Sequence, residues 1–186
     1  MNSSYIAHSA HSTTILALRH RSSMVFVGDG QVTVANTIMK HGAVKLRSIK
    51  SYGVLAGFAG SAADSFTLFE RFEAKLNAHG GQLARSAVEL AKEWRSDKYL
   101  RRLEAMMIVG DKGGMFLLSG VGDVIQPDDG VLAIGSGGNY ALSAARALLC
   151  ASVDKTAREI ATISMQVAAQ ICPFTNDRFS FEEIEL

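Results

Sequence analysis

The chain has 186 residues, of which 48% are apolar and 20% charged, so it can bury one large core and is not expected to be disordered. The formal charge of +1 and two short, interrupted basic runs at residues 45–47 and 98–102 argue against a nucleic-acid surface, so we expect solvated faces or subunit contacts there. The sequence shows neither a secretory signal nor an apolar run of ~18 residues, which predicts a soluble, cytoplasmic protein with no membrane contact.

The first predicted elements are a leader and several strands. Residues 1–12 (MNSSYIAHSAHS) contain no Lys, Arg, Asp or Glu, and we interpret them as a flexible leader. At Thr13 the sequence changes to the β-branched run TTILALR, which predicts a strand. Further strands are expected at residues 24–27, which run into the turn Gly28-Asp29-Gly30, and around 44–49 and 54–59.

Helical periodicity begins at residue 61. Phe66, Phe69, Phe72 and Leu76 recur at three- and four-residue steps, so we predict a helix over residues 61–76 with these side chains in the core. Ser61 and Asp64 resemble a capping box at its start. The remaining predicted elements are a helix after residue 81, strands at 105–109, 115–118, 123–125 and 131–134, helices at 138–149 and 155–171, and a strand at 179–184.

The order of elements predicts the architecture. Strand pairs joined by short turns favour antiparallel sheets, and two such sheets packed face to face would leave both outer faces for helix pairs. The sequence shows no internal repeat and no linker, so we expect one domain over residues 13–186. The predicted fold class is therefore α+β, a four-layer α-β-β-α sandwich.

Common catalytic motifs are missing from the sequence. It has no phosphate-binding loop, no His-Glu-x-x-His and no Gly-x-Ser-x-Gly, and Tyr140 stands where a dinucleotide-binding turn at residues 135–138 would need its third glycine. We therefore expect no nucleotide to bind this chain. Cys150 and Cys172 have neither disulfide nor metal-ligand spacing, and we interpret both as buried thiols in a reducing compartment.

The pair Thr13-Thr14 is the remaining candidate for chemistry. A threonine hydroxyl is a weak nucleophile unless a base lies beside it, and the residue's own α-amine can serve once it becomes the chain terminus. That amine has a pKa of about 7.7–8.0, which suits a base at neutral pH. The chemistry needs a removable leader, a Thr at the start of a strand and a nearby cation. By itself the pair is weak evidence, because β-branched residues often begin strands.

Longer segments carry a resemblance to a known family. They are TTILALR, GDGQVTVANTIMK, VLAGFAGSAADSFTLFERFEAKL, AVELAKEWRSDKYLRRLEAM, LSGVGDVIQP and IGSGGNYALSAARALL. From Thr13 to the C-terminus the chain resembles the bacterial HslV (ClpQ) peptidases, which are relatives of proteasome β subunits. The resemblance implies the α-β-β-α sandwich of N-terminal-nucleophile hydrolases, in agreement with the layer order above.

The resemblance also implies site residues. The nucleophile of the family falls on Thr13, its buried aspartate on Asp29, its lysine on Lys45 and its serine on Ser136, while the backbone N–H of Gly57 would form the oxyanion hole. Lys45 would lower the pKa of the Thr13 amine, and Asp29 would compensate the buried lysine charge. A glycine donor can approach the tetrahedral intermediate closely.

Each of these residues also has a structural interpretation. Gly28-Asp29-Gly30 would pass for a plain turn, Lys45 for a solvated lysine, and Ser136 for the cap of the following helix. Matches in several separate segments at the right mutual spacing favour a catalytic function for Thr13, Asp29 and Lys45.

The chain departs from the family pattern in two places. The family has only a very short leader, and Ser12 would itself be an N-terminal nucleophile if cleavage occurred one bond earlier, although the spacing to Asp29 and Lys45 favours Thr13. The family also binds Na⁺ through backbone carbonyls, which here fall on Ala169, Cys172 and Thr175. The family usually has Gly where Ala169 stands and no proline at Pro173.

The resemblance further implies partners. It predicts two stacked six-membered rings of this chain, a separate HslU-type AAA+ ATPase that delivers unfolded polypeptide, and threonine-type hydrolysis of that polypeptide. The alternative is a non-catalytic subunit of the same fold that keeps its leader and only builds a ring.

Overall fold

A computed structural model describes residues 13–100, 103 and 105–186 of the chain. The leader predicted at residues 1–12, with the alternative nucleophile Ser12, and part of the basic run at 98–102 lie outside these residues. No helix among the described residues is long and apolar enough to cross a membrane.

Two antiparallel sheets form the centre of the molecule. The first has the order β10-β1-β2-β11 and the second the order β5-β6-β7-β8-β9. The strands of the first sheet are β1 (Thr14–His20), β2 (Ser23–Asp29), β10 (Val131–Gly135) and β11 (Phe179–Glu185). Those of the second are β5 (Leu46–Ile49), β6 (Val54–Gly60), β7 (Ala105–Asp111), β8 (Gly114–Ser119) and β9 (Val124–Ile125). The pairing of strands is antiparallel throughout, as predicted.

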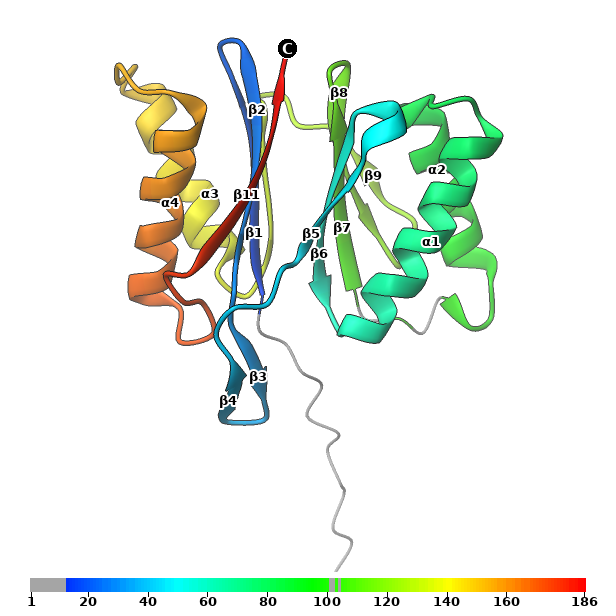
Figure 1. Cartoon of the computed structure of the whole chain (residues 1–186), viewed down its shortest axis with the longest axis horizontal. Helices are drawn as coiled ribbons and strands as arrows, with labels where there is room; N and C mark the ends of the chain where they lie inside the picture. The colour runs from blue at the N-terminus through cyan, green and yellow to red at the C-terminus, as the bar shows by residue number, and fades with distance from the viewer. Residues whose placement is uncertain (1–12, 101–102, 104) are drawn as a thin grey trace, which may run out of the picture.

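Two helix pairs cover the outer faces of the sheets. They are α1 (Ala62–Ala78) with α2 (Leu83–Ser96), and α3 (Gly138–Cys150) with α4 (Ala157–Ile171). Figure 1 shows α3 and α4 on one side of the first sheet and α1 and α2 on the far side of the second. The predicted four-layer α-β-β-α sandwich is confirmed.

Strand β1 is buried on both of its faces. Ile15 and Ala17 pack in the cluster between the two sheets, whereas Leu16 and Leu18 pack against α3 and α4. All four side chains are fully buried. A strand covered on both sides reads as a continuous apolar run, which explains the sequence pattern that begins at Thr13.

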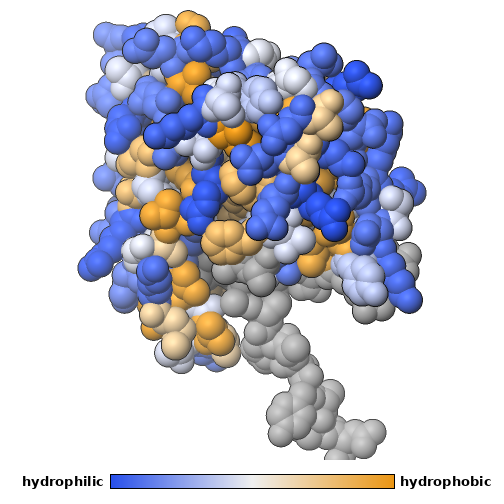
Figure 2. Space-filling view, turned by 45° about the vertical axis from the view of Figure 1, so that its right-hand side comes forward, coloured by the Kyte–Doolittle hydropathy of each residue, from blue (hydrophilic) through white to orange (hydrophobic). Residues whose placement is uncertain are grey.

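The structure adds one element that the sequence did not predict. Strands β3 (Val32–Val34) and β4 (Thr37–Lys40) form a separate two-stranded sheet, which extends from the lower end of the molecule in Figure 1. Val34, Ile38 and Met39 on this hairpin are 48%, 47% and 65% exposed. Apolar side chains gather on this lower lobe in the space-filling view of Figure 2. A two-stranded ribbon with an uncovered apolar surface is marginal by itself, so this hairpin is a candidate subunit contact.

Three further expectations need correction. Phe66 is not a core residue, because it is 55% exposed; the buried face of α1 consists of Leu68, Phe72 and Leu76, with Phe69 partly buried. Cys150 is exposed, and only Cys172 is buried. Helix α4 begins after Thr156 rather than at residue 155, because the hydroxyl of Thr156 and the carboxylate of Glu159 form a capping box.

Candidate active site

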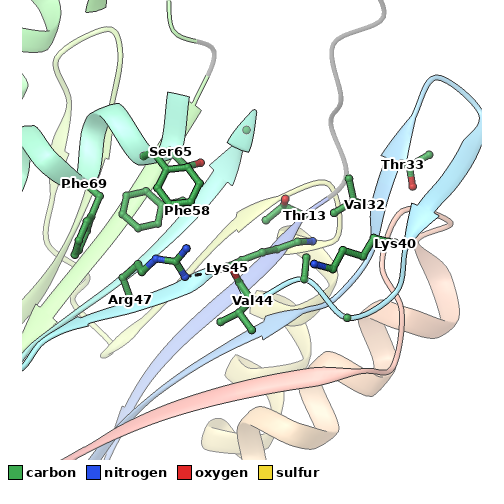
Figure 3. A pocket seen from close by; sticks show the side chains of 14 residues that line it. Thr13, Val32, Thr33, Lys40, Val44, Lys45, Arg47, Phe58, Ser65 and Phe69 are labelled. Atoms are coloured by element: carbon green, nitrogen blue, oxygen red, sulfur yellow. Dashed lines mark hydrogen bonds between the residues drawn. The ribbon is translucent and has the colours of Figure 1, made fainter. Parts of the chain in front are cut away.

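Thr13 lies at the wall of a cavity of about 480 Å³. It directly precedes β1 and is 6% exposed. The other walls come from hairpin β3–β4, the segment leading into β5, the end of β6 and the first turns of α1 (Figure 3). The residues that line the cavity are Thr13, Val32, Thr33, Lys40, Gly42, Ala43, Val44, Lys45, Arg47, Phe58, Gly60, Ser65, Phe66 and Phe69.

The turn between β10 and α3 holds the backbone of Thr13. The backbone N–H of Ser136 donates to the Thr13 carbonyl at 2.9 Å, and the Ser136 hydroxyl donates to the same oxygen at 3.3 Å. Gly135 has a φ of +90°, and a Cβ there would lie 1.9 Å from the Thr13 carbonyl oxygen. Glycine is therefore required at position 135 for the close approach of the two segments.

Thr14, the next residue, also fixes the start of β1 through hydrogen bonds. Its hydroxyl accepts a 3.0 Å hydrogen bond from the Gly137 N–H and lies 2.7 Å from the hydroxyl of Thr175. Its backbone N–H donates to Asp29 Oδ1 at 2.7 Å. Thr14 is fully buried, so each of these polar groups needs its partner. Thr14 thus joins the start of β1 to three segments that are distant in the sequence.

Asp29 is the centre of the polar network. Its carboxylate is fully buried and accepts four hydrogen bonds. Oδ1 receives the N–H of Thr14 at 2.7 Å and the ammonium of Lys45 at 2.8 Å. Oδ2 receives the backbone N–H groups of Gln31 at 2.9 Å and Asn176 at 3.4 Å. A buried carboxylate that accepts from this many donors is held in one orientation.

Lys45 reaches the cavity from the segment before β5. Its side chain is 10% exposed, and its ammonium donates to Asp29 Oδ1 at 2.8 Å and to the carbonyl of Gln31 at 2.7 Å. Burial lowers the pKa of Lys45 below its usual value of 10.5, while the charge of Asp29 and the hydrogen bond to it act in the opposite direction. The result is a cation fixed in the wall of the cavity that also contains Thr13.

Four of the predicted site residues come together in this way: Thr13, Asp29, Lys45 and Ser136. Ser136 does not cap the following helix, because the N-cap of α3 is Gly137 and that cap has no side-chain hydrogen bond. Its described contacts are instead the two hydrogen bonds to Thr13. The interpretation of Ser136 as a helix cap was therefore wrong.

Gly57 does not lie where the resemblance implied. It lies in the middle of β6, where it pairs with Leu46 of β5 on one side and with Ile108 of β7 on the other. A Cβ at Gly57 would lie 2.7 Å from Cγ2 of Ile15, so the residue faces the core between the sheets rather than the cavity. Since the next N–H, that of Phe58, donates to Lys45 on the β5 side, the alternation of a strand directs the Gly57 N–H toward β7.

Gly60 is the glycine of the same AGFAG run that lines the cavity. The pairing of β5 with β6 ends at Leu46 opposite Gly57, whereas Gly60 pairs with Ala105 of β7. By the same alternation its N–H points to the side of Phe58 N–H, past the end of β5. The sequence offered two glycines in this strand, and only the sheet register distinguishes them.

The loop after α4 contains the carbonyls predicted to hold sodium. Ala169 cannot receive a helical hydrogen bond from residue 173, because Pro173 has no N–H. The Cys172 carbonyl accepts from the Thr175 N–H at 3.1 Å and keeps a second lone pair. Carbonyl oxygens at a helix C-terminus suit a hard cation, so these residues fit the ion. In the part of the chain that the structure describes, no group of His, Cys, Asp or Glu side chains could hold a metal ion.

Comparison with known proteins identifies the family of the chain. Residues 9–184 match the family described as proteasome subunit. The chain belongs to the proteasome family. Within it, the chain is 58% identical over 179 residues to the ATP-dependent protease subunit ClpQ of Bacillus pumilus, covering 95% of this chain and 99% of that protein. It is 57% identical to the ATP-dependent protease subunit HslV of Oceanobacillus iheyensis, covering 94% and 97%.

A solved structure of a proteasome-family relative has the same fold. The crystal structure of eukaryotic HslV from Trypanosoma brucei superposes with a TM-score of 0.89 at 45% identity, covering 93% of this chain and 99% of that one. The resemblance of this chain to the HslV (ClpQ) group of the proteasome family is therefore confirmed over nearly its whole length.

Proposed function

We propose that the chain is the proteolytic subunit of an ATP-dependent protease of the HslV type, with Thr13 as an N-terminal nucleophile. The observation that carries the proposal is the position of Thr13. It opens a buried strand beside a cavity, in whose wall the Lys45 ammonium is held by a fully buried Asp29. The relatives of the chain are named ATP-dependent protease subunits, which supports proteolysis.

Activation begins with removal of residues 1–12. While residue 12 is attached, the nitrogen of Thr13 is an amide and cannot accept a proton. Once it is free, the positive charge of Lys45 lowers the pKa of the new amine and keeps a fraction of it neutral near pH 7. Asp29 orients Lys45 and compensates its charge in the low-dielectric site.

Peptide hydrolysis then follows in two stages, formation of an ester on Thr13 and hydrolysis of that ester. The Thr13 amine takes the hydroxyl proton while Oγ1 attacks the substrate carbonyl carbon, and the carbonyl π electrons move to the oxygen. The C–N bond breaks, and the proton passes from the amine to the leaving nitrogen, which leaves an ester on Oγ1. A water molecule then attacks the ester carbon while the amine takes a proton from it. The bond between that carbon and Oγ1 breaks, and the amine returns the proton to Oγ1, which releases the acid and restores the Thr13 hydroxyl.

The oxyanion of this reaction needs a preorganised donor. The backbone N–H of Gly60 is better placed than that of Gly57, because Gly60 lines the cavity with Thr13 while Gly57 faces the core. Such a donor contributes about 2.7–4 kcal/mol to the transition state. We therefore assign this function to Gly60 and withdraw it from Gly57.

A sodium ion at Ala169, Cys172 and Thr175 would serve this site indirectly. When bound, it would supply a fixed positive charge that orders the carbonyls of the loop after α4. The same loop carries the Thr175 hydroxyl, which contacts Thr14, and the Asn176 N–H, which contacts Asp29. The loop residues themselves then hold Thr14 and Asp29 in place.

The names of the relatives also imply an assembly. We propose that this chain forms a closed ring with copies of itself, in two stacked rings of six, and receives unfolded polypeptide from an HslU-type AAA+ ATPase. A location in the cytoplasm stays a prediction. The alternative function is a non-catalytic ring subunit of the same fold that retains its leader.

The mass of the intact protein from its native host distinguishes these functions. The proposed protease loses residues 1–12 and begins at Thr13, while cleavage one bond earlier leaves Ser12 at the terminus. A chain that keeps its full mass in the assembled particle and cleaves no peptide is the non-catalytic subunit, and our proposal would be wrong.

A further inference from the structure

Gln31 is a buried polar residue that the mechanism above does not use. It follows Gly30 in the turn after β2 and is 3% exposed. Burial of an amide side chain is unfavourable unless its hydrogen bonds are made, so its partners indicate what the residue does. An inference about its function depends on the proposed chemistry at Thr13.

The backbone of Gln31 closes a ring around the ion pair. Its N–H donates to Asp29 Oδ2 at 2.9 Å, and its carbonyl accepts from the Lys45 ammonium at 2.7 Å. Lys45 in turn donates to Asp29 Oδ1 at 2.8 Å. The position of the ammonium is thus set by two oxygens, one on the carboxylate and one on the Gln31 backbone.

The side chain of Gln31 ties this backbone to a distant segment. Its amide nitrogen donates to the Thr33 hydroxyl at 3.0 Å and to the Pro173 carbonyl at 2.9 Å. Pro173 lies in the loop after α4, whose Thr175 hydroxyl lies 2.7 Å from the hydroxyl of Thr14. Any residue except proline would supply the backbone N–H and carbonyl at position 31, but the link to Pro173 requires a side chain with a hydrogen-bond donor.

We propose that Gln31 is a positioning residue for Lys45. Its side-chain amide bonds to the loop after α4 and thereby fixes the Gln31 backbone carbonyl, which accepts from the Lys45 ammonium. The four-carbon stem of lysine is flexible, and it loses its preferred position when one of its acceptors moves. Asp29 has three other donors to hold it, whereas the Gln31 carbonyl depends on the conformation of its turn.

The charged side chains around the cavity determine how a movement of Lys45 changes the pKa of the Thr13 amine. Asp29, at the end of β2, forms the ion pair with Lys45. The other ionisable side chains in the described walls are Lys40 from β4 and Arg47 from β5. β6, α1 and the turn after β10 present no charged side chain to the cavity in the described residues. If Lys45 moves away from Thr13, its effect on the pKa of the amine decreases and that pKa rises.

The test uses the assembled, processed protein with its partner ATPase and a fluorogenic peptide. Gln31→Met keeps the length and volume of the side chain but removes both amide donors. We expect the acid limb of its kcat/KM profile to move to higher pH by about half a unit or more, because more of the amine is protonated at a given pH. Thr33→Val removes one acceptor and should move the limb in the same direction by less.

A matched control separates positioning from stability. Ser86→Ala removes a buried hydroxyl from α2 that donates to the Gln82 carbonyl, remote from Thr13. It should lower the melting temperature and leave the pH profile unchanged. If Gln31→Met does not assemble, Gln31→Leu, which also removes both amide donors, takes its place.

The outcomes are distinguishable. If the acid limb of the kcat/KM profile stays at the wild-type pH in the Gln31 variant that assembles, the positioning role of Gln31 is overturned, even if its activity is lower. A wild-type protein that hydrolyses no peptide after its leader is removed would instead contradict the proposed function itself.

Discussion

The ammonium of Lys45 and the carboxylate of Asp29 form a 2.8 Å ion pair in which the carboxylate is fully buried. Desolvation of two charges offsets most of their attraction, so a pair of this kind is weak evidence for stabilisation. Its partners are the backbones of Thr14 and Gln31, and it lies beside the cavity that contains Thr13. This position agrees with the function that we propose for the pair, an effect on the chemistry at Thr13.

The first prediction concerns the charge of Lys45. Lys45→Met keeps much of the stem but deletes the ammonium, so the Thr13 amine should stay protonated at neutral pH and peptide cleavage should be lost there. One unit of pKa corresponds to about 1.4 kcal/mol between the protonation states. Arg should restore little, because its planar group does not reproduce the compact ammonium. The measurement is kcat/KM against pH, after mass spectrometry confirms leader removal; a normal profile would make Lys45 an ordinary lysine.

The second prediction separates stability from activity. Lys45→Met leaves the carboxylate of Asp29 buried without its cation, which should cost roughly 3–5 kcal/mol of stability. Replacing both residues, as Asp29→Asn with Lys45→Met, removes the unpaired buried charge but turns the Asn amide nitrogen toward backbone N–H donors. The double variant should therefore recover part of the melting temperature and none of the activity. Recovery of cleavage by the double variant would contradict the electrostatic function of the pair.

The lowered pKa of Lys45 gives a third prediction, for stability against pH. The folded protein binds this proton less tightly than the unfolded chain does, so unfolding takes up a proton in the window that ends at 10.5. The free energy of unfolding should therefore rise with pH as the solution passes from the lowered pKa toward 10.5. Denaturant titrations of the wild type and of Lys45→Met isolate this contribution. Parallel curves for the two proteins would show that Lys45 has its ordinary pKa.

The fourth prediction distinguishes the two glycines of β6. Gly57→Ala places a Cβ 2.7 Å from Ile15 in the core, which should destabilise the fold by about 1–3 kcal/mol. The remaining assembled enzyme should keep a kcat near that of the wild type. Gly60→Ala changes a residue with a φ of +133° in the cavity wall and should reduce kcat more than stability. The reverse pattern in melting and turnover measurements would return the oxyanion function to Gly57.

Much of the fold was predictable from local sequence. The β-branched run of β1 and the periodic apolar residues of the helices mark elements whose buried faces repeat in the chain. Hairpin β3–β4 was not predicted, because Thr37–Lys40 is exposed along its whole length and shows no alternation. Phe66 fits the period of α1 but stands on its exposed side, which only the packing of the helix on the sheet determines.

The site was less accessible to local reasoning. The partners of Asp29 come from positions up to 147 residues away, so its four hydrogen bonds depend on the tertiary fold. The resemblance to the family supplied Thr13, Asp29, Lys45 and Ser136, which the structure brings together. It also implied Gly57 as the oxyanion donor, whereas we propose Gly60, because the direction of an N–H follows from strand register rather than from residue type.

The nucleophile provides the most direct test of the account. Peptide hydrolysis should be measured for Thr13→Ala and Thr13→Ser, each as an assembled particle with its partner ATPase and with its N-terminus verified by mass. Ala removes the attacking oxygen and should abolish cleavage without loss of assembly, while Ser keeps a hydroxyl and an α-amine and should retain activity. Cleavage by Thr13→Ala at the wild-type rate would contradict the assignment of Thr13 and the mechanism built on it.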